Sequence, residues 1–243
     1  MNSKIEELKR IIEESNNIVF FGGAGVSTES GIPDFRSANG IYNQDLGREV
    51  SPEEMISHTF YVRHPEAFFE FYKDKLVYPD AEPNDCHKAL AELERQGKVK
   101  AVVTQNIDGL HQKAGSQVVY ELHGSTLRNY CENCHAFYDE KFVLDADGVP
   151  RCAKCGGRVK PDVVLYEEGL DEAVIQGAVD AISKADTLII GGTTLIVYPA
   201  AGLIHYFRGN HLVLINKSST SADSLADLVI NDNIGEVFRQ VME

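Results

Sequence analysis

The chain has no apolar run long enough to cross a membrane. Its 243 residues contain no window of the roughly 18 uninterrupted apolar residues that a membrane span requires. The N-terminal segment MNSKIEELKRIIEES is amphipathic and acidic, so it lacks the basic stretch and apolar core of a secretory signal. We therefore expect a cytoplasmic protein that does not contact membranes.

Basic residues are scarce as well. Lys and Arg number 23 against 37 Asp and Glu, which gives a net charge of −14. Binding to phosphate backbones depends on clustered Lys and Arg, so this balance argues against direct contact with nucleic acid. An acidic surface either attracts basic partners, such as lysine-rich peptides, or only keeps the protein in solution.

Internal repeats, low-complexity tracts and long linkers are also absent. Apolar residues make up 43% of the chain, enough for a substantial core. Short β-rich apolar runs alternate with amphipathic helical patterns, which predicts an α/β fold: a Rossmann-like, doubly wound parallel sheet with helices on both faces. The strands are expected within NIVFF, VKAVVTQN, VVYELHG, DTLIIGG, HLVLIN and DLVIN.

Two stretches interrupt this rhythm. Residues 40–80 are predicted to form a helical insert, and residues 126–159 contain two cysteine pairs. We expect the two inserts to form a smaller domain, and residues 1–39, 81–125 and 160–243 to form the Rossmann-like domain. Both inserts leave the sheet at loops that follow strands, where α/β proteins bind their ligands.

A glycine turn, Gly23-Ala24-Gly25, follows the first expected strand directly. Glycines allow a tight turn and a close approach to a pyrophosphate, but Thr28 stands where the G-x-G-x-x-G pattern has its third glycine. A nucleotide site and a purely structural turn therefore both stay open. The acidic residue of a dinucleotide fold, expected about 20 residues further on, falls within GIYNQDL, which does not resemble a strand. This is not an ordinary dehydrogenase loop.

The segment PDFR lies just downstream of this turn. Pro33 prevents a long helix from beginning here, which predicts an ordered loop carrying Asp34, Phe35 and Arg36. The arginine could pair with phosphate and the phenylalanine could pack on a flat heterocycle. Their alternative roles are a surface charge and a core anchor.

Amide and carboxylate side chains follow the strand VKAVVTQN. Gln105, Asn106 and Asp108 lie at its carboxyl end, where they could hold an amide-bearing ligand such as nicotinamide. A helix N-cap by Asn106 or Asp108 is the alternative. His123 ends the next strand and could act as a base, although a single histidine is more often structural.

Four of the five cysteines form two C-x-x-C pairs that are separated by seventeen residues. Four thiolates complete the tetrahedral shell of a closed, structural zinc site, and a redox pair is the competing interpretation. The predicted ligands are Cys131, Cys134, Cys152 and Cys155. Cys86, on an expected helix, is predicted to be a buried small residue.

Small hydroxyl residues follow two later strands. GGTTLIVYPAAGL and LINKSS place Thr193, Thr194 and Asn216 where they suit ribose and adenine contacts, or ordinary turns and caps.

The order of these motifs resembles that of the sirtuin family of NAD-dependent protein deacylases. GAGVSTESGIPDFR is followed by TQNIDGLHQKAG, ELHG, CENC, CAKC, KPDVVLYEE and GTTLIVYPA, so the resemblance runs from about Ile18 to the C-terminus. It implies NAD as a co-substrate, a structural zinc ion and acyl-lysine peptides as partners. We expect the protein to act as a monomer.

The resemblance also implies roles for individual residues. His123 would be the general base, with Asn106 and Asp108 as further catalytic residues. The expected NAD contacts are Ala24, Gly25, Thr28, Asp34, Phe35, Arg36, Gln105, Asn106, Ile107, Asp108, His123, Gly192, Thr193, Thr194, Asn216 and Ile234. The expected peptide contacts are Val164, Leu165, Tyr166 and Glu168.

The implied activity is protein-lysine deacetylation. The acyl group would move from lysine to ADP-ribose with release of nicotinamide, and no hydride would be transferred. The alternatives are mono-ADP-ribosyl transfer and a non-catalytic NAD sensor. A zinc-ribbon nucleic-acid binder would need a basic surface, which this chain lacks.

Three positions depart from the family pattern. Gly192-Thr193-Thr194 replaces GTS and keeps a hydroxyl group. Glu167 replaces a glycine in the loop expected to pair with the peptide as an added strand. Tyr72 and Lys75 replace a Tyr-x-x-Arg pair that binds acidic acyl groups, so we expect uncharged acyl groups such as acetyl.

Overall fold

The larger part of the molecule is built on a six-stranded parallel sheet. The computed structural model describes residues 2–38, 40–43 and 50–243. Strands pair in the order β3-β2-β1-β7-β8-β9, and every neighbouring pair is parallel, which confirms the predicted doubly wound sheet. The bounds are β1 (Ile18–Gly22), β2 (Val99–Thr104), β3 (Val119–Glu121), β7 (Thr187–Gly191), β8 (His211–Ile215) and β9 (Leu228–Ile230).

Helices cover both faces of this sheet because successive strand residues point to opposite sides. In β1, Phe20 belongs to the hydrophobic cluster under α1, α5 and α9, whereas Phe21 belongs to the cluster under α8 and the 3-10 helix η4. Both phenylalanines are fully buried, so the central strand reads as a continuous apolar run. The bounds are α1 (Asn2–Glu14), α5 (Asp85–Arg95), α6 (Leu110–Ala114), α8 (Glu172–Lys184), η4 (Ala200–Tyr206) and α9 (Ile234–Met242).

Both ends of α5 carry residues that suit a helix end. Asn84 is its N-cap and accepts the backbone N–H of Cys86 at 3.0 Å, while Gly97 takes a positive φ of 78° just beyond its end. Cys86 itself is buried, as predicted.

The smaller part combines a short antiparallel sheet with helices. Its strands pair in the order β5-β4-β6, and its core joins aromatic side chains of the helical insert, such as Phe68 and Tyr72, to Val143 and Val159 of the cysteine insert. The two inserts therefore share one hydrophobic core. The bounds are α2 (Pro52–Met55), α3 (His58–Arg63), α4 (Pro65–Lys75), β4 (Gly124–Cys131), β5 (Phe137–Tyr138), α7 (Glu140–Asp145) and β6 (Val159–Val163).

Strand pairing extends the smaller part beyond the expected limits 126–159. Gly124 pairs with Val163 in the β4–β6 ladder, so residues 160–163 join the small sheet and not the parallel one. The division into domains otherwise stays a prediction, and residues 1, 39 and 44–49 of the expected units lie outside the described ones. Within GIYNQDL, the described residues Ile41–Asn43 form a 3-10 turn and no strand.

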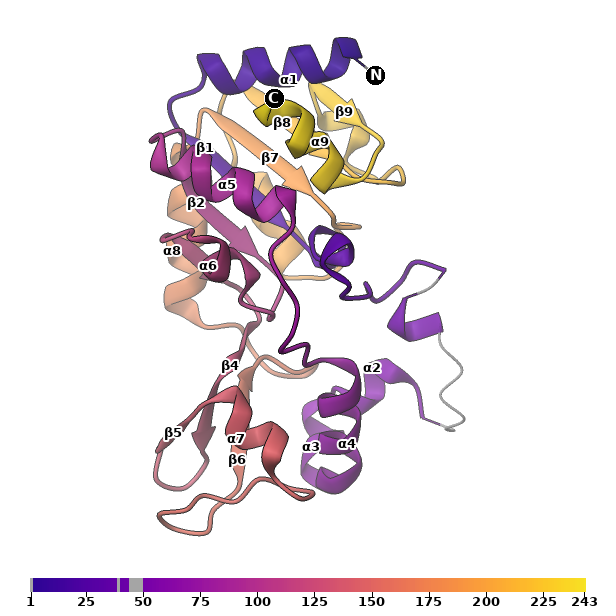
Figure 1. Ribbon diagram of the computed structural model, residues 1–243, viewed down its shortest axis with the longest axis vertical. Helices are drawn as coiled ribbons and strands as arrows, with labels where there is room; N and C mark the ends of the chain where they lie inside the picture. Colours follow the sequence, from indigo (N-terminus) through magenta and orange to yellow (C-terminus); the bar gives the residue numbers. More distant parts are fainter. Residues whose placement is uncertain (1, 39, 44–49) are drawn as a thin grey trace.

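The two parts are stacked along the long axis of the molecule, and β4 runs from the larger part into the smaller one (Figure 1). Within the described ranges, no helix combines the length and the apolar character that a membrane crossing requires.

Candidate active site

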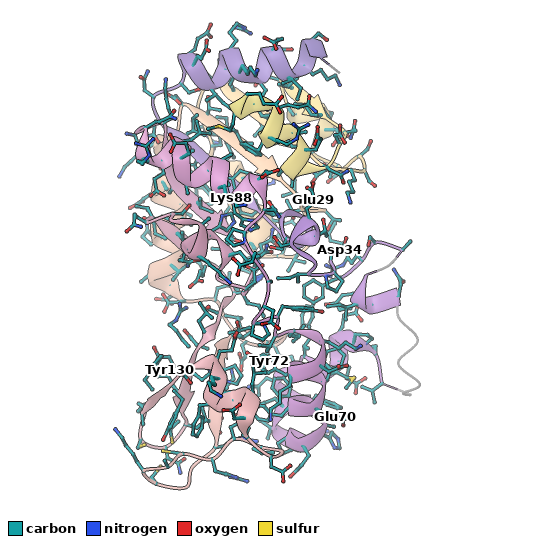
Figure 2. The ribbon with its side chains drawn as sticks, viewed as in Figure 1. Glu29, Asp34, Glu70, Tyr72, Lys88 and Tyr130 are labelled. Atoms are coloured by element: carbon teal, nitrogen blue, oxygen red, sulfur yellow. The ribbon has the colours of Figure 1, made fainter. Side chains whose placement is uncertain are left out.

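A cavity of about 560 Å³ is lined by both parts of the molecule. Its wall includes the carboxyl ends of the parallel strands, the loop at 32–37 and the loop after β6, which is where an open α/β sheet binds ligands. Asp34 lies where its loop leaves the larger part, whereas Tyr72 lies inside the smaller one (Figure 2). The structure places on this wall all the residues expected to contact NAD or peptide: Ala24, Gly25, Thr28, Asp34, Phe35, Arg36, Gln105, Asn106, Ile107, Asp108, His123, Val164, Leu165, Tyr166, Glu168, Gly192, Thr193, Thr194, Asn216 and Ile234.

The glycine turn packs tightly against the loop after β7. A Cβ atom on Gly23 would lie 2.8 Å from Cβ of Thr193, and one on Gly25 would lie 2.8 Å from Cα of Gly192. The amides of both turn glycines donate to carbonyls, at 3.2 Å to Gly191 and at 2.8 Å to Gly192. These two N–H groups are therefore engaged within the protein, so the glycines serve the close approach of two loops as well as the cavity wall.

The segment after the turn is an ordered loop and no long helix, as Pro33 predicts. Two 3-10 turns, Ala24–Val26 and Thr28–Ser30, precede it. Asp34 shapes the loop, because its Oδ1 accepts the backbone N–H groups of Arg36 at 3.0 Å and Ser37 at 2.7 Å.

Phe35 and Arg36 both contact Tyr42, which sequence reasoning did not identify. The rings of Phe35 and Tyr42 lie 5.2 Å apart, and the Arg36 guanidinium lies 5.1 Å from the Tyr42 ring centre. Arg36 Nη2 also donates to the Tyr166 hydroxyl at 3.3 Å. Phe35 packs against the core of the smaller part, so its alternative role as a core anchor applies too.

A hydrogen-bonded cluster lies beyond the end of β2. Asn106 Nδ2 donates to Ser27 Oγ at 3.1 Å, and Ser27 Oγ donates to Asp108 Oδ2 at 2.6 Å. The other carboxylate oxygen of Asp108 accepts the amide of Leu110 at 2.9 Å. The N-cap of α6 is Gly109, so the alternative of an N-cap by Asn106 or Asp108 is wrong. Burial raises the pKa of Asp108, while the bond from Ser27 lowers it. Ser27 is buried, and sequence analysis did not identify it, because nothing in GAGVSTESG indicates its pairing with Asp108.

His123 has a defined tautomer because of its neighbour. Its Nδ1 lies 2.9 Å from the backbone oxygen of Gln105, and a carbonyl can only accept, so Nδ1 carries the proton and Nε2 has the free electron pair. Burial lowers the pKa of His123, and the bond to Gln105 opposes this effect. The histidine is therefore neutral at pH 7 and can accept a proton at Nε2.

The far end of the cavity is organised by Asn216. Its Oδ1 accepts the amide of Thr193 at 2.9 Å, and Thr193 Oγ1 accepts Gln105 Nε2 at 3.1 Å. The Asn216 Nδ2 donor is buried without a partner among the described residues. A buried, unsatisfied donor on a cavity wall fits a ligand with acceptor atoms, such as a nucleoside.

The four predicted cysteine ligands lie together in the smaller part. Their Sγ atoms all lie within 4.8 Å of one another, and all are free thiols. Zn–S bonds in a tetrahedron place sulfur atoms about 3.8 Å apart, close to the 3.4 Å between Cys131 and Cys155 and the 3.5 Å between Cys134 and Cys152. Gly156, directly after Cys155, has a φ of 74°, a conformation that favours glycine. The donor set fits zinc.

Tyr72 and Lys75, which stand in place of the Tyr-x-x-Arg pair, do not meet in the cavity. Lys75 lines the wall, but Tyr72 is buried in the aromatic core, where its ring stacks on Phe68 at 5.8 Å. The two side chains therefore do not combine to bind an acidic acyl group.

Comparisons with known proteins match almost the whole chain. Residues 23–199 match the Sir2 family model. The NAD-dependent protein deacetylase of Clostridium perfringens is 70% identical over 100% of both chains. A solved Sir2 structure with deacetylated p53 peptide and 3′-O-acetyl ADP ribose is 38% identical, with a TM-score of 0.90, over 98% of this chain and 97% of that one. Another, with p53 peptide and NAD+, is 37% identical with a TM-score of 0.85 over the same shares.

Proposed function

This chain belongs to the Sir2 family, and we propose that it is an NAD-dependent protein-lysine deacetylase. The acyl group moves from lysine to ADP-ribose, and nicotinamide is released. One observation carries the proposal. A single cavity brings together the glycine turn, the Asn106–Asp108 cluster, His123 and the loop after β6. The groups proposed for catalysis, NAD binding and peptide binding thus face one shared space.

NAD, when bound, supplies a ribose whose bond to nicotinamide can break so that the acyl oxygen takes its place. The chain's part is to bind and orient the groups that react. Asn106 and Asp108, fixed to each other through Ser27, would border the nicotinamide amide. Thr193, Thr194 and Asn216 would contact the adenosine half, where the free donor of Asn216 can meet an acceptor.

His123 would act as the general base. Because the Gln105 carbonyl fixes the proton on Nδ1, Nε2 is available to remove a proton from a ribose hydroxyl. The lowered pKa keeps the imidazole unprotonated at neutral pH. A general base of this kind contributes about 10²- to 10⁴-fold in rate.

The zinc ion would have a structural role. Four cysteine ligands complete a tetrahedral shell and leave no position for a substrate, and the cluster lies outside the residues that line the cavity. Its expected effect is to hold β4 and β6 of the smaller part together. A cytoplasmic location and a monomeric state stay predictions from the sequence.

A panel of acyl-lysine peptides incubated with NAD and followed by mass spectrometry tests the function. We expect loss of the acetyl group, with nicotinamide and acetyl-ADP-ribose formed in equal amounts. Transfer of ADP-ribose to protein without loss of the acyl group would instead identify a mono-ADP-ribosyltransferase. Absence of any NAD consumption would leave the non-catalytic sensor.

A further inference from the structure

Glu167 adopts a backbone conformation that ordinarily belongs to glycine. Its φ is 75°, and only two other non-glycine residues in the described chain, His135 and Leu195, have a positive φ. An L-residue is disfavoured there because its Cβ crowds the backbone. It lies in the loop after β6 between Tyr166 and Glu168, and all three residues line the cavity. An unfavourable conformation at such a place needs a compensating interaction.

The side chain of Glu167 supplies that interaction. Its Oε2 accepts two hydrogen bonds from Thr59 in the first turn of α3, at 2.8 Å from the backbone N–H and at 2.7 Å from Oγ1. These bonds to Thr59 lower the pKa of Glu167, so the group is a carboxylate at neutral pH. Bonds to an ionised acceptor are stronger than neutral ones.

The neighbouring residues extend the same connection. The Tyr166 amide donates to the Ile56 carbonyl at 3.1 Å, and the His58 amide donates to the Tyr166 carbonyl at 2.9 Å. Glu168 accepts from His58 Nδ1 at 2.8 Å and from Lys160 Nζ at 3.1 Å. Three consecutive loop residues are thereby joined to residues 56–59 of the helical insert.

This connection fixes one wall of the cavity. The hydroxyl of Tyr166 contacts Tyr42 at 3.1 Å and Arg36 at 3.3 Å, so the loop after β6 also meets the loop that begins at Ile32. Val164 is anchored from the other side, because its amide donates to the carbonyl of His123 at 3.0 Å. The loop is therefore held between the general base and α3.

We propose that Glu167 is a positioning residue for the acyl-lysine peptide: by binding Thr59 it holds residues 164–168 in one conformation, as a preformed edge for the incoming chain. The inference rests on the proposed deacetylase function. An edge that is already ordered costs less entropy when a peptide pairs with it. Glu167 thus acts on peptide affinity and not on the chemical step.

Steady-state kinetics with an acetyl-lysine peptide test this role. We expect Glu167→Ala to raise the peptide KM about fivefold to tenfold, because losing the bonds to Thr59 resembles the loss of a helix N-cap. The kcat and the KM for NAD should stay within about twofold of wild type. Glu167→Gly removes the backbone strain as well as the clamp, so its peptide KM should also rise. A wild-type KM in Glu167→Gly would overturn the proposal. Glu66→Ala, in the first turn of α4 and outside the cavity wall, is the matched control.

Variants of Thr59 distinguish two roles of Glu167: positioning of the loop, and direct attraction of a basic peptide. Thr59→Val removes one of the two donors and should raise the peptide KM about twofold to threefold, and the double variant should resemble Glu167→Ala alone. Additive effects, or a Glu167 effect that appears only with peptides rich in Lys and Arg, would show that the carboxylate acts on the peptide directly and would refute the clamp.

Hydrogen exchange distinguishes a failed clamp from a failed function. Without substrate, the amides of Tyr166 and His58 should exchange faster in Glu167→Ala than in wild type. Unchanged exchange overturns the clamp alone. A wild-type protein that consumes no NAD with any acyl peptide overturns the proposed function, and the peptide role with it.

Discussion

The two parts of the molecule are stabilised in different ways. The parallel sheet has continuous apolar strands buried between two helical layers, whereas the smaller part depends on an aromatic cluster, a four-cysteine cluster and polar contacts. The groups expected to do the chemistry follow strands of the larger part, which hold them rigidly. The peptide loop is instead attached to the smaller part through hydrogen bonds. Chemistry and substrate affinity should therefore respond to different substitutions.

The largest effect on turnover is expected where the larger part supplies the base. His123→Ala should lower kcat about 10²- to 10⁴-fold, because the variant lacks the Nε2 proton acceptor. The melting temperature should stay within a few degrees of wild type, since the side chain is outside the hydrophobic clusters. Steady-state assays and a thermal melt measure both. His205→Ala, on the exposed side of η4, is the control. Near-normal deacetylation by His123→Ala would contradict the assigned role.

At the cysteine cluster, a substitution should lower stability and not the chemical step. Cys152→Ser should lose bound zinc and open the smaller part, because metal binding supplies about 10 kcal/mol or more of folding free energy in small zinc modules. Metal analysis and limited proteolysis measure the result, with cleavage expected between residues 124 and 163. Cys86→Ala, a buried cysteine of the larger part, should keep its zinc. Full zinc content in Cys152→Ser would rule out the four-ligand site.

The sequence predicted the larger part better than the smaller one. Continuous apolar runs such as IVFFG indicate buried strands from the sequence alone, and the predicted order of strands and helices follows from them. The expected cysteine insert ends at residue 159, yet VKPDV pairs through its backbone with β4 of the small sheet. Only the fold determines which sheet such a short strand joins.

Some residues of the site could be predicted from the sequence and others could not. Motif residues that follow strands, such as Asn106 and His123, were predicted to lie on one cavity and do so. Ser27 and Tyr42 were missed, because their partners Asp108 and Arg36 become neighbours only in three dimensions. The role of Glu167 depends on Thr59, which is 108 residues away in the chain.

Two buried histidines should make the stability of the larger part depend on pH in the acid range. His87 and His111 are fully buried with ring centres 4.7 Å apart, and burial lowers the pKa of His87 to about 4 and that of His111 well below its usual value. The unfolded chain binds these protons near pH 6.5, before the folded one does. Stability is therefore complete above pH 6.5 and falls as pH drops toward 4, by about 3 kcal/mol for His87 alone.

Urea unfolding at pH 7 and at pH 5 measures this dependence. His111→Leu removes two ring nitrogens that have no partner among the described residues, so we expect a smaller loss of stability between these pH values than in wild type. His64→Leu, at the start of α4 in the smaller part, is the control and should keep the wild-type dependence. An unchanged dependence in His111→Leu would mean that this histidine does not contribute to acid unfolding.

The smallest effect is expected at Tyr138, which connects the aromatic and cysteine clusters of the smaller part. Its hydroxyl donates to Cys152 Sγ at 3.1 Å and accepts the Ala153 amide at 2.8 Å, so it orients a predicted zinc ligand. Tyr138→Phe should release zinc to a chelator about tenfold faster, while kcat with zinc bound stays within about twofold. Tyr130→Phe alters an exposed tyrosine of β4 (Figure 2) and should release zinc at the wild-type rate. Equal release from both variants would show that the hydroxyl is not needed, because the four thiolates alone would then set the stability of the cluster.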